Sequence, residues 1–466
     1  MESHPPDLAA LKASIVAGRV IEDSDLLASY EVPERGNQGS ARFVVEPGNV
    51  DEVSRVASWA YRNHARLVVQ GANTGVVGAS TPDQSGSQGV LNLAGLHQIL
   101  DFSTVDRTVV VEAGVRLDAL NEFLAPHDLF FPIELGANPS MGGLVATNAG
   151  GARTIRYGDT ASRVIGIEGA LADEAGTRIG GLSVLSKDNS RLHIGRLLVG
   201  SVGALGVITR IALKVAPRPT AVVTAMVAPG SHHDVLACLM LLEEQFGEAL
   251  SAFEFISGSA MDLVLRHVPG LRSPFPEMNR SCYLLIEVGN RGDEADLEEA
   301  LAEALNGLSS NHQTAIEDAV IAPPAHLWAL RHSLSEGVHR AGAVISFDLS
   351  VPRGSLPTLR DRIDAIFAHQ ENAPVVSDFG HWGDGGTHLK LVYPNELPSN
   401  DFEIREQIYD VVVHELGGSF SAEHGIGPDN ADFYRKYIPE HEQRLERRIK
   451  QVLDPRGVWG TDPFAS

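Results

Sequence analysis

Two histidines and a glycine-rich stretch stand close together toward the C-terminal end of the chain. His381 and His388 flank the run Trp382-Gly383-Asp384-Gly385-Gly386-Thr387. So much glycine disfavours a helix, so we predict a turn between two strands that brings the imidazoles together at one end of a sheet. A divalent metal held with Glu423 is one interpretation, because imidazole and carboxylate are its usual ligands. Solvated histidines beside a turn are the other.

The composition limits the partners. The 466 residues carry 60 acidic and 37 basic side chains, a formal charge of −23. This charge repels phosphate backbones and anionic membranes, so nucleic acid is not an expected partner. An anionic substrate would need a locally positive pocket made by arginine, lysine or a metal. The length favours two domains, each with its own core.

The cysteines and the apolar runs bear on the cellular compartment that we expect for the chain. Cys238 and Cys282 are its only cysteines and both lie in apolar runs, which excludes a disulfide framework or a built-in iron–sulfur cluster and predicts buried thiols. No run of about eighteen apolar residues and no basic-then-apolar leader is present, so we expect neither a membrane span nor secretion. The prediction is a cytoplasmic protein.

Three clusters of small residues precede the histidines, at 71–78, 139–151 and 200–209. The first follows a predicted strand and offers consecutive backbone N–H groups that can bind an anion such as a pyrophosphate. It has neither the G-x-G-x-x-G order nor a P-loop lysine, so a nicotinamide enzyme or an NTPase is not supported. One cluster alone indicates a turn, but three suggest one long ligand threaded between two α+β lobes.

The remaining pattern predicts the elements that position these groups. We expect a helix capped by Asp51 and leading into a strand at 67–70. The prolines at 217 and 219 favour a domain boundary, followed by strand-helix-strand units typical of a ferredoxin-like domain. Its strands are predicted near 221–228, 251–257, 282–288 and 343–351, and its helices near 232–246 and 293–306. The predicted organisation is a helical lead-in at 1–39 followed by segments at 40–218, 219–400 and 401–466.

A family resemblance rests on the clusters taken in order. The three clusters resemble the FAD-binding domain of the vanillyl-alcohol oxidase and p-cresol methylhydroxylase flavoproteins. Within that superfamily the chain is similar to the FAD-dependent D-2-hydroxyacid dehydrogenases, particularly those of D-2-hydroxyglutarate, and D-lactate dehydrogenases share the pattern. The motifs that carry this likeness are Gly136-Ala137, Gly142-Gly143, Thr147-Asn148-Ala149-Gly150-Gly151-Ala152-Arg153 and Arg156-Tyr157-Gly158. The resemblance implies an α+β fold with a two-lobed p-cresol methylhydroxylase-type FAD-binding domain, a ferredoxin-like substrate cap and a C-terminal helical segment that returns to the FAD domain.

The resemblance also implies how FAD is held. Binding should be noncovalent, because Thr74 stands where covalently flavinylated relatives carry histidine. Val202 stands where the family commonly has glutamate. The residues implied to contact FAD are Gly71, Asn73, Thr74, Gly75, Gly78, Pro139, Ser140, Gly143, Thr147, Asn148, Gly150 and Ile208.

The same resemblance assigns the chemistry. His381, His388 and Glu423 are implied to bind a divalent metal, commonly zinc, that chelates the substrate's carboxylate and 2-hydroxyl. His424 is then the base that removes the hydroxyl proton, while the Cα hydride passes to flavin N5. The sequence around Arg331 resembles the family's Trp-x-x-Arg, whose arginine binds a substrate carboxylate, with Ser335 as the neighbouring hydroxyl. Without the family, Arg331 would be interpreted as a solvated helix charge.

The substrate is less strongly indicated. The D-2-hydroxyglutarate enzymes usually carry lysine at the position of Ser346 and asparagine at that of Lys390. If both positions face one pocket, Lys390 would bind a distal carboxylate, which favours D-2-hydroxyglutarate. If Lys390 lies on the surface, D-lactate, D-malate or glycolate is the alternative. A non-redox FAD enzyme of the alkyl-ether lipid synthase type is a further alternative.

The partners expected outside the chain follow from these assignments. Reduced FAD needs an external electron acceptor, for which an electron-transfer flavoprotein, a quinone, a cytochrome and oxygen all remain open. A homodimer is the base-rate expectation.

Overall fold

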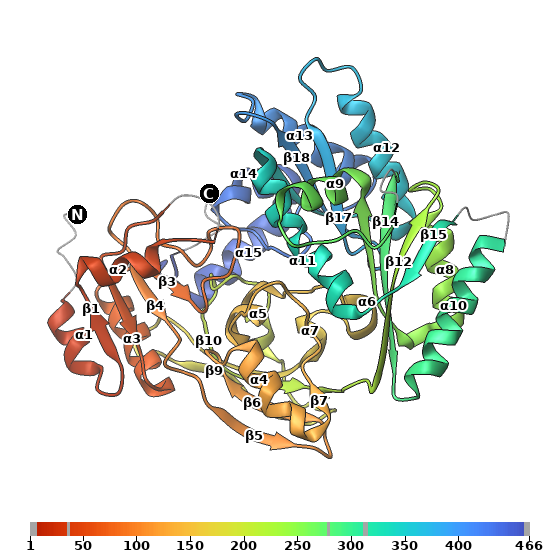
Figure 1. Cartoon of the computed structure of the whole chain (residues 1–466). Coiled ribbons are helices and arrows are strands. Elements are labelled where there is room, and N and C mark those ends of the chain that lie inside the picture. The colour runs from red at the N-terminus through yellow and green to blue at the C-terminus, as the bar shows by residue number, and fades with distance from the viewer. Residues whose placement is uncertain (1–6, 35–37, 277–279, 311–315, 461–466) are drawn as a thin grey trace. The chain divides into compact units, whose positions relative to one another are not determined.

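The computed structural model describes residues 7–34, 38–276, 280–310 and 316–460 (Figure 1). The chain divides into two compact units, and each is described by itself. The first consists of Met1–Ala149, Asp159–Pro217 and Glu423–Ser466, and the second of Gly150–Gly158 and Arg218–Ala422.

The first unit contains a four-stranded sheet in the order β1-β2-β4-β3. β2 (Phe43–Glu46) and β3 (Leu67–Gln70) run parallel to β4 (Gly89–Asn92), which lies between them. β1 (Arg19–Ile21) pairs antiparallel with β2. The predicted lead-in at 1–39 is therefore not only helical, because β1 lies between α1 (Leu8–Ser14) and α2 (Ser24–Glu31). A strand of three residues is too short for its alternation to be read in a sequence.

Helix α3 (Val50–Arg62) connects β2 to β3. Its N-cap is Asn49 and not the predicted Asp51, since Asn49 Oδ1 accepts the Glu52 N–H at 2.9 Å. An amide oxygen at the N-cap satisfies one of the backbone donors that the first helical turn leaves open. The helix begins two residues earlier than the sequence indicated, and its apolar residues Val53, Val56, Ala57 and Ala60 are buried.

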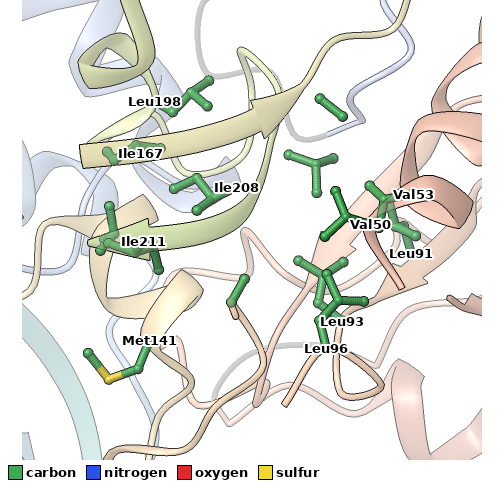
Figure 2. Close-up of a cluster of buried hydrophobic side chains, with 14 of the residues drawn as sticks. Val50, Val53, Leu91, Leu93, Leu96, Met141, Ile167, Leu198, Ile208 and Ile211 are labelled. Carbon is green, nitrogen blue, oxygen red and sulfur yellow. The ribbon is translucent and has the colours of Figure 1, made fainter. Parts of the chain in front are cut away.

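A second sheet of the first unit is antiparallel, with the order β5-β6-β10-β8-β9. Figure 2 shows that side chains of the two sheets and of their helices share one core. Leu91, Val50 and Val53 come from the first sheet and α3, and Ile167 and Ile211 come from the second sheet. The five strands are β5 (Ile99–Ser103), β6 (Thr108–Glu112), β8 (Val164–Ala170), β9 (Arg178–Gly181) and β10 (Val207–Lys214).

Short elements complete the first unit. A two-stranded ladder pairs β7 (Leu129–Phe130) with β11 (Ala216–Pro217). The second glycine-rich cluster forms a helix, α5 (Met141–Thr147). The other helices of this unit are α4 (Leu117–Leu124), α7 (Thr160–Arg163), α14 (Ala431–Tyr437) and α15 (Glu440–Leu453).

The second unit is built on a seven-stranded antiparallel sheet with the order β15-β12-β14-β13-β17-β18-β16. Its first four strands, with α8 after β12 and α10 after β14, have the order of a ferredoxin-like domain, so that prediction is confirmed. The strands are β12 (Ala221–Pro229), β13 (Leu250–Ser257), β14 (Cys282–Asn290), β15 (Ile316–Ile321), β16 (Ala343–Ser350), β17 (Val375–Gly380) and β18 (Gly386–Tyr393).

Helices cover both faces of this sheet (Figure 1). α9 (Gly258–His267) and α11 (Pro324–Ala341) bury Met261, Leu330 and Leu334 against Ile256 and Phe379 on one face. On the other face lie α8 (Val235–Phe246), α10 (Glu294–Ser310) and α12 (Leu356–Phe367). α6 (Thr154–Tyr157), α13 (Asp401–Asp410) and a π-helical turn at Val411–Glu415 complete the unit.

Both cysteines of the second unit are buried as predicted. Burial raises the pKa of the Cys238 and Cys282 thiols to about 12. Thiols in this state are poor nucleophiles and metal ligands, so they contribute to packing only.

Candidate active site

The predicted histidine hairpin is present. β17 and β18 are antiparallel, with Phe379 opposite His388, and the five residues between the strands form a tight turn. The carbonyl of His381 accepts the backbone N–H groups of Asp384, Gly385 and Gly386 at 3.0–3.1 Å. Left-handed φ values of 143° at Gly380 and 105° at Gly385 explain the glycines there, because other residues rarely adopt them.

This turn is held in place from outside. Trp382 stacks on Phe255 of β13, with ring centroids 3.9 Å apart and planes 12° apart. Gly383 donates its N–H to the Phe253 carbonyl at 3.2 Å, and Arg353 donates to the Gly383 carbonyl at the same distance. Packing and hydrogen bonds therefore fix the position from which His381 projects.

The two histidines are enclosed, in contrast to the interpretation of solvated turn residues. Their ring centroids are 5.2 Å apart, and their side chains are 8% and 13% exposed for His381 and His388 respectively. Each Nδ1 lies beside a carboxylate: His381 Nδ1 is 2.6 Å from Glu254 Oε1, and His388 Nδ1 is 3.5 Å from Asp348 Oδ1. Carboxylates at Nδ1 are typical partners of metal-binding histidines, whose Nε2 then faces the metal.

Glu254 of β13 also pairs with Arg331 of α11. Its Oε2 accepts the Arg331 Nε–H at 2.5 Å. Burial alone would raise the pKa of this carboxyl, but Arg331 and His381 outweigh it and lower the pKa to about 2. Arg331, only 11% exposed, is not a solvated helix charge, and its guanidinium also lies over the Phe379 ring at 5.3 Å. Ser335 follows one helical turn later on α11.

Lys390 lies on the same sheet face as His388. In the β16–β18 ladder Ser346 is opposite Lys390 and Asp348 is opposite His388, and directly paired residues share a face. His388 and Lys390 are two positions apart on β18, which again places them on one face. Lys390 is 2% exposed, so it is a buried residue and not a surface lysine.

Glu254 and Asp348 were not identified from the sequence. Both are carboxylates inside apolar strands, in Leu250–Ser257 and Ala343–Ser350, and a charge at such a position is the signal that could have revealed them. A buried carboxylate requires donors, but the donors of Glu254 are 77 and 127 positions away along the chain. Sequence spacing carries no information about such partners.

Glu423 and His424 follow a segment that is fixed in the second unit. Ser419 exchanges backbone hydrogen bonds with Ser350, and the Ala422 N–H donates to the carbonyl and the carboxylate of Asp348 at 3.2 and 3.1 Å. Glu423 is the next residue along the chain and the first of the returning segment of the first unit. In that unit Gly425 adopts a φ of 77°. Glu423 and His424 therefore directly follow a segment that hydrogen bonds hold to β16.

Within the first unit the three glycine-rich clusters converge on α5. A Cβ added to Gly71 would lie 2.2 Å from Ser140 Oγ, the N-cap of α5. The N–H groups of Gly200 and Val202 donate to the Val145 and Ala146 carbonyls at 3.1 and 2.8 Å. Residues more than fifty positions apart in sequence therefore meet, as a single threaded ligand would require.

Other residues implied to contact FAD flank α5 or lie on β10, and one belongs to the second unit. Asn148 caps the end of α5 with a φ of 52° and donates to Asp159 at 2.8 Å. Pro139 immediately precedes the N-cap of α5, and Ile208 lies on β10. Gly150 belongs to the short stretch Gly150–Gly158 of the second unit.

Left-handed backbone marks the same clusters. Asn73 and Gly78 have φ values of 56° and 69° in the first cluster, and Val202 has a φ of 47° in the third. A β-branched residue in this region is strained by about 1–3 kcal/mol. Val202 keeps the conformation because its N–H is bonded to α5 and because glycines flank it at 200 and 203.

Comparison with known proteins places the chain in a family. Residues 41–179 match the model of an FAD binding domain, and residues 218–459 match that of the C-terminal domain of FAD linked oxidases. The chain is 35% identical to the mitochondrial D-2-hydroxyglutarate dehydrogenase of Bos taurus over 97% of its length and 82% of that protein. It is 31% identical to a putative mitochondrial D-lactate dehydrogenase of Schizosaccharomyces pombe, covering 90% and 81%.

The solved structures agree on the fold. The structure of p-cresol methylhydroxylase superposes with a TM-score of 0.72 at 14% identity, covering 98% of this chain and 97% of that one. At this identity the likeness concerns the fold alone. The predicted α+β p-cresol methylhydroxylase-type fold is confirmed.

The prediction of a cytoplasmic protein is wrong by the same comparison, because both curated relatives are named as mitochondrial proteins. Composition and buried thiols indicate only that the chain needs no disulfides, and they do not identify the cellular compartment. Among the helices of the described residues, none is long and apolar enough to cross a membrane.

These matches cover both units and confirm the prediction of an FAD-dependent enzyme of the D-2-hydroxyacid dehydrogenase group. The chain therefore belongs to the FAD-linked oxidases, in the branch that includes the enzymes named D-2-hydroxyglutarate dehydrogenase and D-lactate dehydrogenase.

Proposed function

We propose that the chain oxidises a D-2-hydroxy acid, preferentially D-2-hydroxyglutarate, to the 2-oxo acid with noncovalently bound FAD and a divalent metal. The observation that carries the proposal is the gathering of His381, His388, Arg331 and Lys390 at one buried sheet face of an FAD-linked oxidase. Each of these groups matches one feature of the substrate.

The histidines fit a metal site. One ring nitrogen of His381 and one of His388 lie within 4.8 Å of each other, and carboxylates lie beside both Nδ1 atoms. Glu423, one residue beyond the anchored Ala422, would add a carboxylate ligand, and such a set favours zinc. Bound there, zinc would chelate the substrate's carboxylate and 2-hydroxyl and make the hydroxyl more acidic.

The charge balance supports a metal as well. Arg331 by itself does not provide net positive charge here, because Glu254 pairs with its guanidinium. Counting Glu254, Asp348 and Glu423 against Arg331 and Lys390, carboxylates outnumber cations, so an anionic substrate would be repelled. A divalent cation reverses the sign. Arg331, with Ser335 beside it, then orients the substrate carboxylate with its remaining donors.

Lys390 favours a dicarboxylic substrate. The condition for its pairing with a distal carboxylate was that Ser346 and Lys390 face the same side, and their direct pairing across β16 and β18 supports this. Because the side chain of Ser346 is small, the longer side chain of Lys390 on the neighbouring strand has room beside it. D-2-Hydroxyglutarate, with its second carboxylate, fits this arrangement better than D-lactate.

The glycine-rich clusters fit FAD. Gly71, Asn73, Thr74, Gly75 and Gly78 would hold the pyrophosphate through backbone N–H groups. Pro139, Ser140, Gly143, Thr147, Asn148, Gly150 and Ile208 would line the flavin. FAD, when bound, supplies the acceptor for the hydride that leaves the substrate Cα.

His424 is proposed as the general base. As an imidazole next to Glu423 it can take the 2-hydroxyl proton while the Cα hydride leaves, so the alcohol loses two electrons and two protons in balance. The electrons must then pass to an acceptor outside the chain. The electron-transfer flavoprotein, quinone, cytochrome and oxygen remain candidates, as does a homodimeric assembly.

Anaerobic flavin reduction tests the proposal. The FAD-loaded protein is mixed with D-2-hydroxyglutarate, D-malate, D-lactate or glycolate, and the loss of visible flavin absorbance is followed. We expect about one equivalent of flavin to be reduced per site, fastest with D-2-hydroxyglutarate. Faster reduction by D-lactate or glycolate would indicate that one of these smaller acids is the substrate. Unchanged absorbance with every acid would remove it and favour the non-redox alkyl-ether synthase alternative.

A further inference from the structure

Glu254 occupies an unusual place among the buried charges of the second unit. It lies in the middle of β13, and its side chain is fully buried. Its two oxygens have different partners: Oε1 is 2.6 Å from His381 Nδ1, and Oε2 is 2.5 Å from Arg331 Nε. One carboxylate therefore links a histidine of the β17–β18 turn to an arginine of α11.

The contacts of Glu254 determine which atoms of His381 and Arg331 donate hydrogen bonds to it. A carboxylate only accepts hydrogen bonds, so the ring proton of His381 must be on Nδ1, and Nε2 is the nitrogen that would bind a metal. The guanidinium of Arg331 is bound through Nε, so its terminal nitrogens are the donors directed beyond Glu254. Removing the charge of Glu254 would release both constraints.

A second buried glutamate shows what a structural carboxylate looks like in the same sheet. Glu287 of β14 is opposite Ala252, so it shares a sheet face with Glu254. It accepts hydrogen bonds from Arg153 Nε at 3.0 Å and from Trp328 Nε1 at 2.9 Å. Arg153 and Trp328 have no assigned role in metal or substrate binding. Glu287 is therefore a matched control for burial, strand position and ion pairing.

We propose that Glu254 is a positioning residue that sets the metal ligand His381 and the substrate-binding Arg331 together. This inference rests on the proposed function, since it assumes that His381 binds metal and Arg331 binds a carboxylate. Metal affinity and substrate affinity then depend on one side chain that touches neither ligand. His388 has a looser counterpart in Asp348, at 3.5 Å, so the stronger dependence falls on His381.

The test uses Glu254→Gln in the FAD-loaded full chain. Glutamine has one acceptor oxygen, so its amide group would face one of the two donors. After metal depletion, zinc is titrated against a competing chelator, which measures metal affinity without reference to activity. We expect zinc affinity to fall about 10- to 100-fold, as is typical when the partner of a ligating histidine is lost. The KM for D-2-hydroxyglutarate should rise while FAD remains bound.

Three variants separate the positions. Glu287→Gln should lower thermal stability but leave zinc affinity and KM within about twofold of the wild type. Arg331→Gln should raise KM with little change in zinc affinity, because the His381–Glu254 contact remains. His381→Gln should abolish tight zinc binding. Glu254→Gln is thus expected to weaken zinc binding and substrate binding together without abolishing either, whereas Arg331→Gln weakens substrate binding alone and His381→Gln removes tight zinc binding.

Conservative replacement keeps the proposal testable if glutamine prevents folding. Glu254→Asp retains the charge with a shorter reach and should give zinc affinity and KM between those of the wild type and the glutamine variant. If the folded Glu254 variants match the wild type in both measurements, the positioning role is refuted. A wild-type protein that binds no zinc and is not reduced by any acid would instead refute the proposed function itself.

Discussion

In the first unit the residues implied to hold FAD act through their backbone. Glycines and left-handed positions at 71–78, 139–151 and 200–209 bring N–H groups and carbonyls together around α5. In the second unit the proposed chemistry depends on side chains, where Glu254 contacts both His381 and Arg331. A backbone site is disturbed when a side chain is added to a glycine, whereas a side-chain site is disturbed when a hydrogen-bonding partner is removed. The two regions should therefore respond differently to substitution.

The largest effect is expected when a side chain is added to a glycine of the FAD-binding clusters that has no room for it. A Cβ at Gly142 would lie 2.7 Å from Ala113 Cβ and 2.9 Å from the Ala113 carbonyl oxygen, neither of which can rotate away. Gly142→Ala should therefore displace α5 from β6, destabilise the first unit by about 1–3 kcal/mol and strip FAD from the protein. Flavin content after gel filtration measures this effect.

Gly136→Ala is the matched control, because a Cβ there meets nothing within 4 Å among the described residues. Full flavin content in the Gly142 variant would mean that the clusters tolerate side chains, and the contrast between the two regions would then fail.

An intermediate effect is expected at the side-chain site. Lys390→Met removes a buried charge but keeps a similar apolar stem. Because hydrogen bonds to charged groups contribute about 1.5–3 kcal/mol, the KM for D-2-hydroxyglutarate should rise about 10- to 100-fold while that for D-lactate changes little. Equal losses for both acids in steady-state assays would show that Lys390 does not contact the distal carboxylate.

The smallest effect on activity is expected at a carboxylate that is held mainly by backbone N–H groups, because a change there affects stability alone. Glu52 of α3 is fully buried and accepts the N–H groups of Val16, Ala17 and Gly48 at 2.7–2.8 Å. Burial alone would raise its pKa, but these backbone donors outweigh it and lower the pKa below the usual value. Glu52→Gln should cost about 1–3 kcal/mol at neutral pH.

The pH dependence has a definite sign. A lowered pKa in the folded state stabilises the protein above the ordinary glutamate pKa, and this contribution is lost as the pH falls through the folded value. The stability difference between the wild type and Glu52→Gln in urea should therefore shrink on acidification. A difference that is constant or grows at acid pH would contradict the assignment.

The contrast also explains what could be predicted from the sequence. Glycine runs and the His381–His388 spacing are local, so the hairpin and the three clusters were predicted from composition and turn chemistry alone. Three of the four ferredoxin-like strands, β12, β13 and β14, were predicted because each is a long apolar run with clear ends. The fourth, β15, was missed because acidic residues at 317 and 318 interrupt its apolar residues. Strand β1 was missed because three residues are too few to show the alternation of apolar and polar side chains. The cap at Asn49 was missed because Asp51 is an equally suitable residue type for an N-cap.

The side-chain network could not be predicted in this way. Glu254 is 127 positions from His381, and the short β13–β17 ladder, which pairs Phe255 with Gly380 and Ile256 with Phe379, brings their strands together. Buried pairing between distant strands is a property of the tertiary fold. The metal ligands and the base were inferred from family resemblance, and they stay predictions until metal binding is measured.

The central claim is that a metal held by His381, His388 and Glu423 enables the oxidation. The most direct measurement is anaerobic flavin reduction by D-2-hydroxyglutarate in the wild-type protein before metal removal, after removal with a chelator, and after zinc is restored. We predict that reduction stops when the metal is removed while FAD stays bound, and that it returns with zinc. Reduction at an unchanged rate in the metal-depleted protein would contradict the claim.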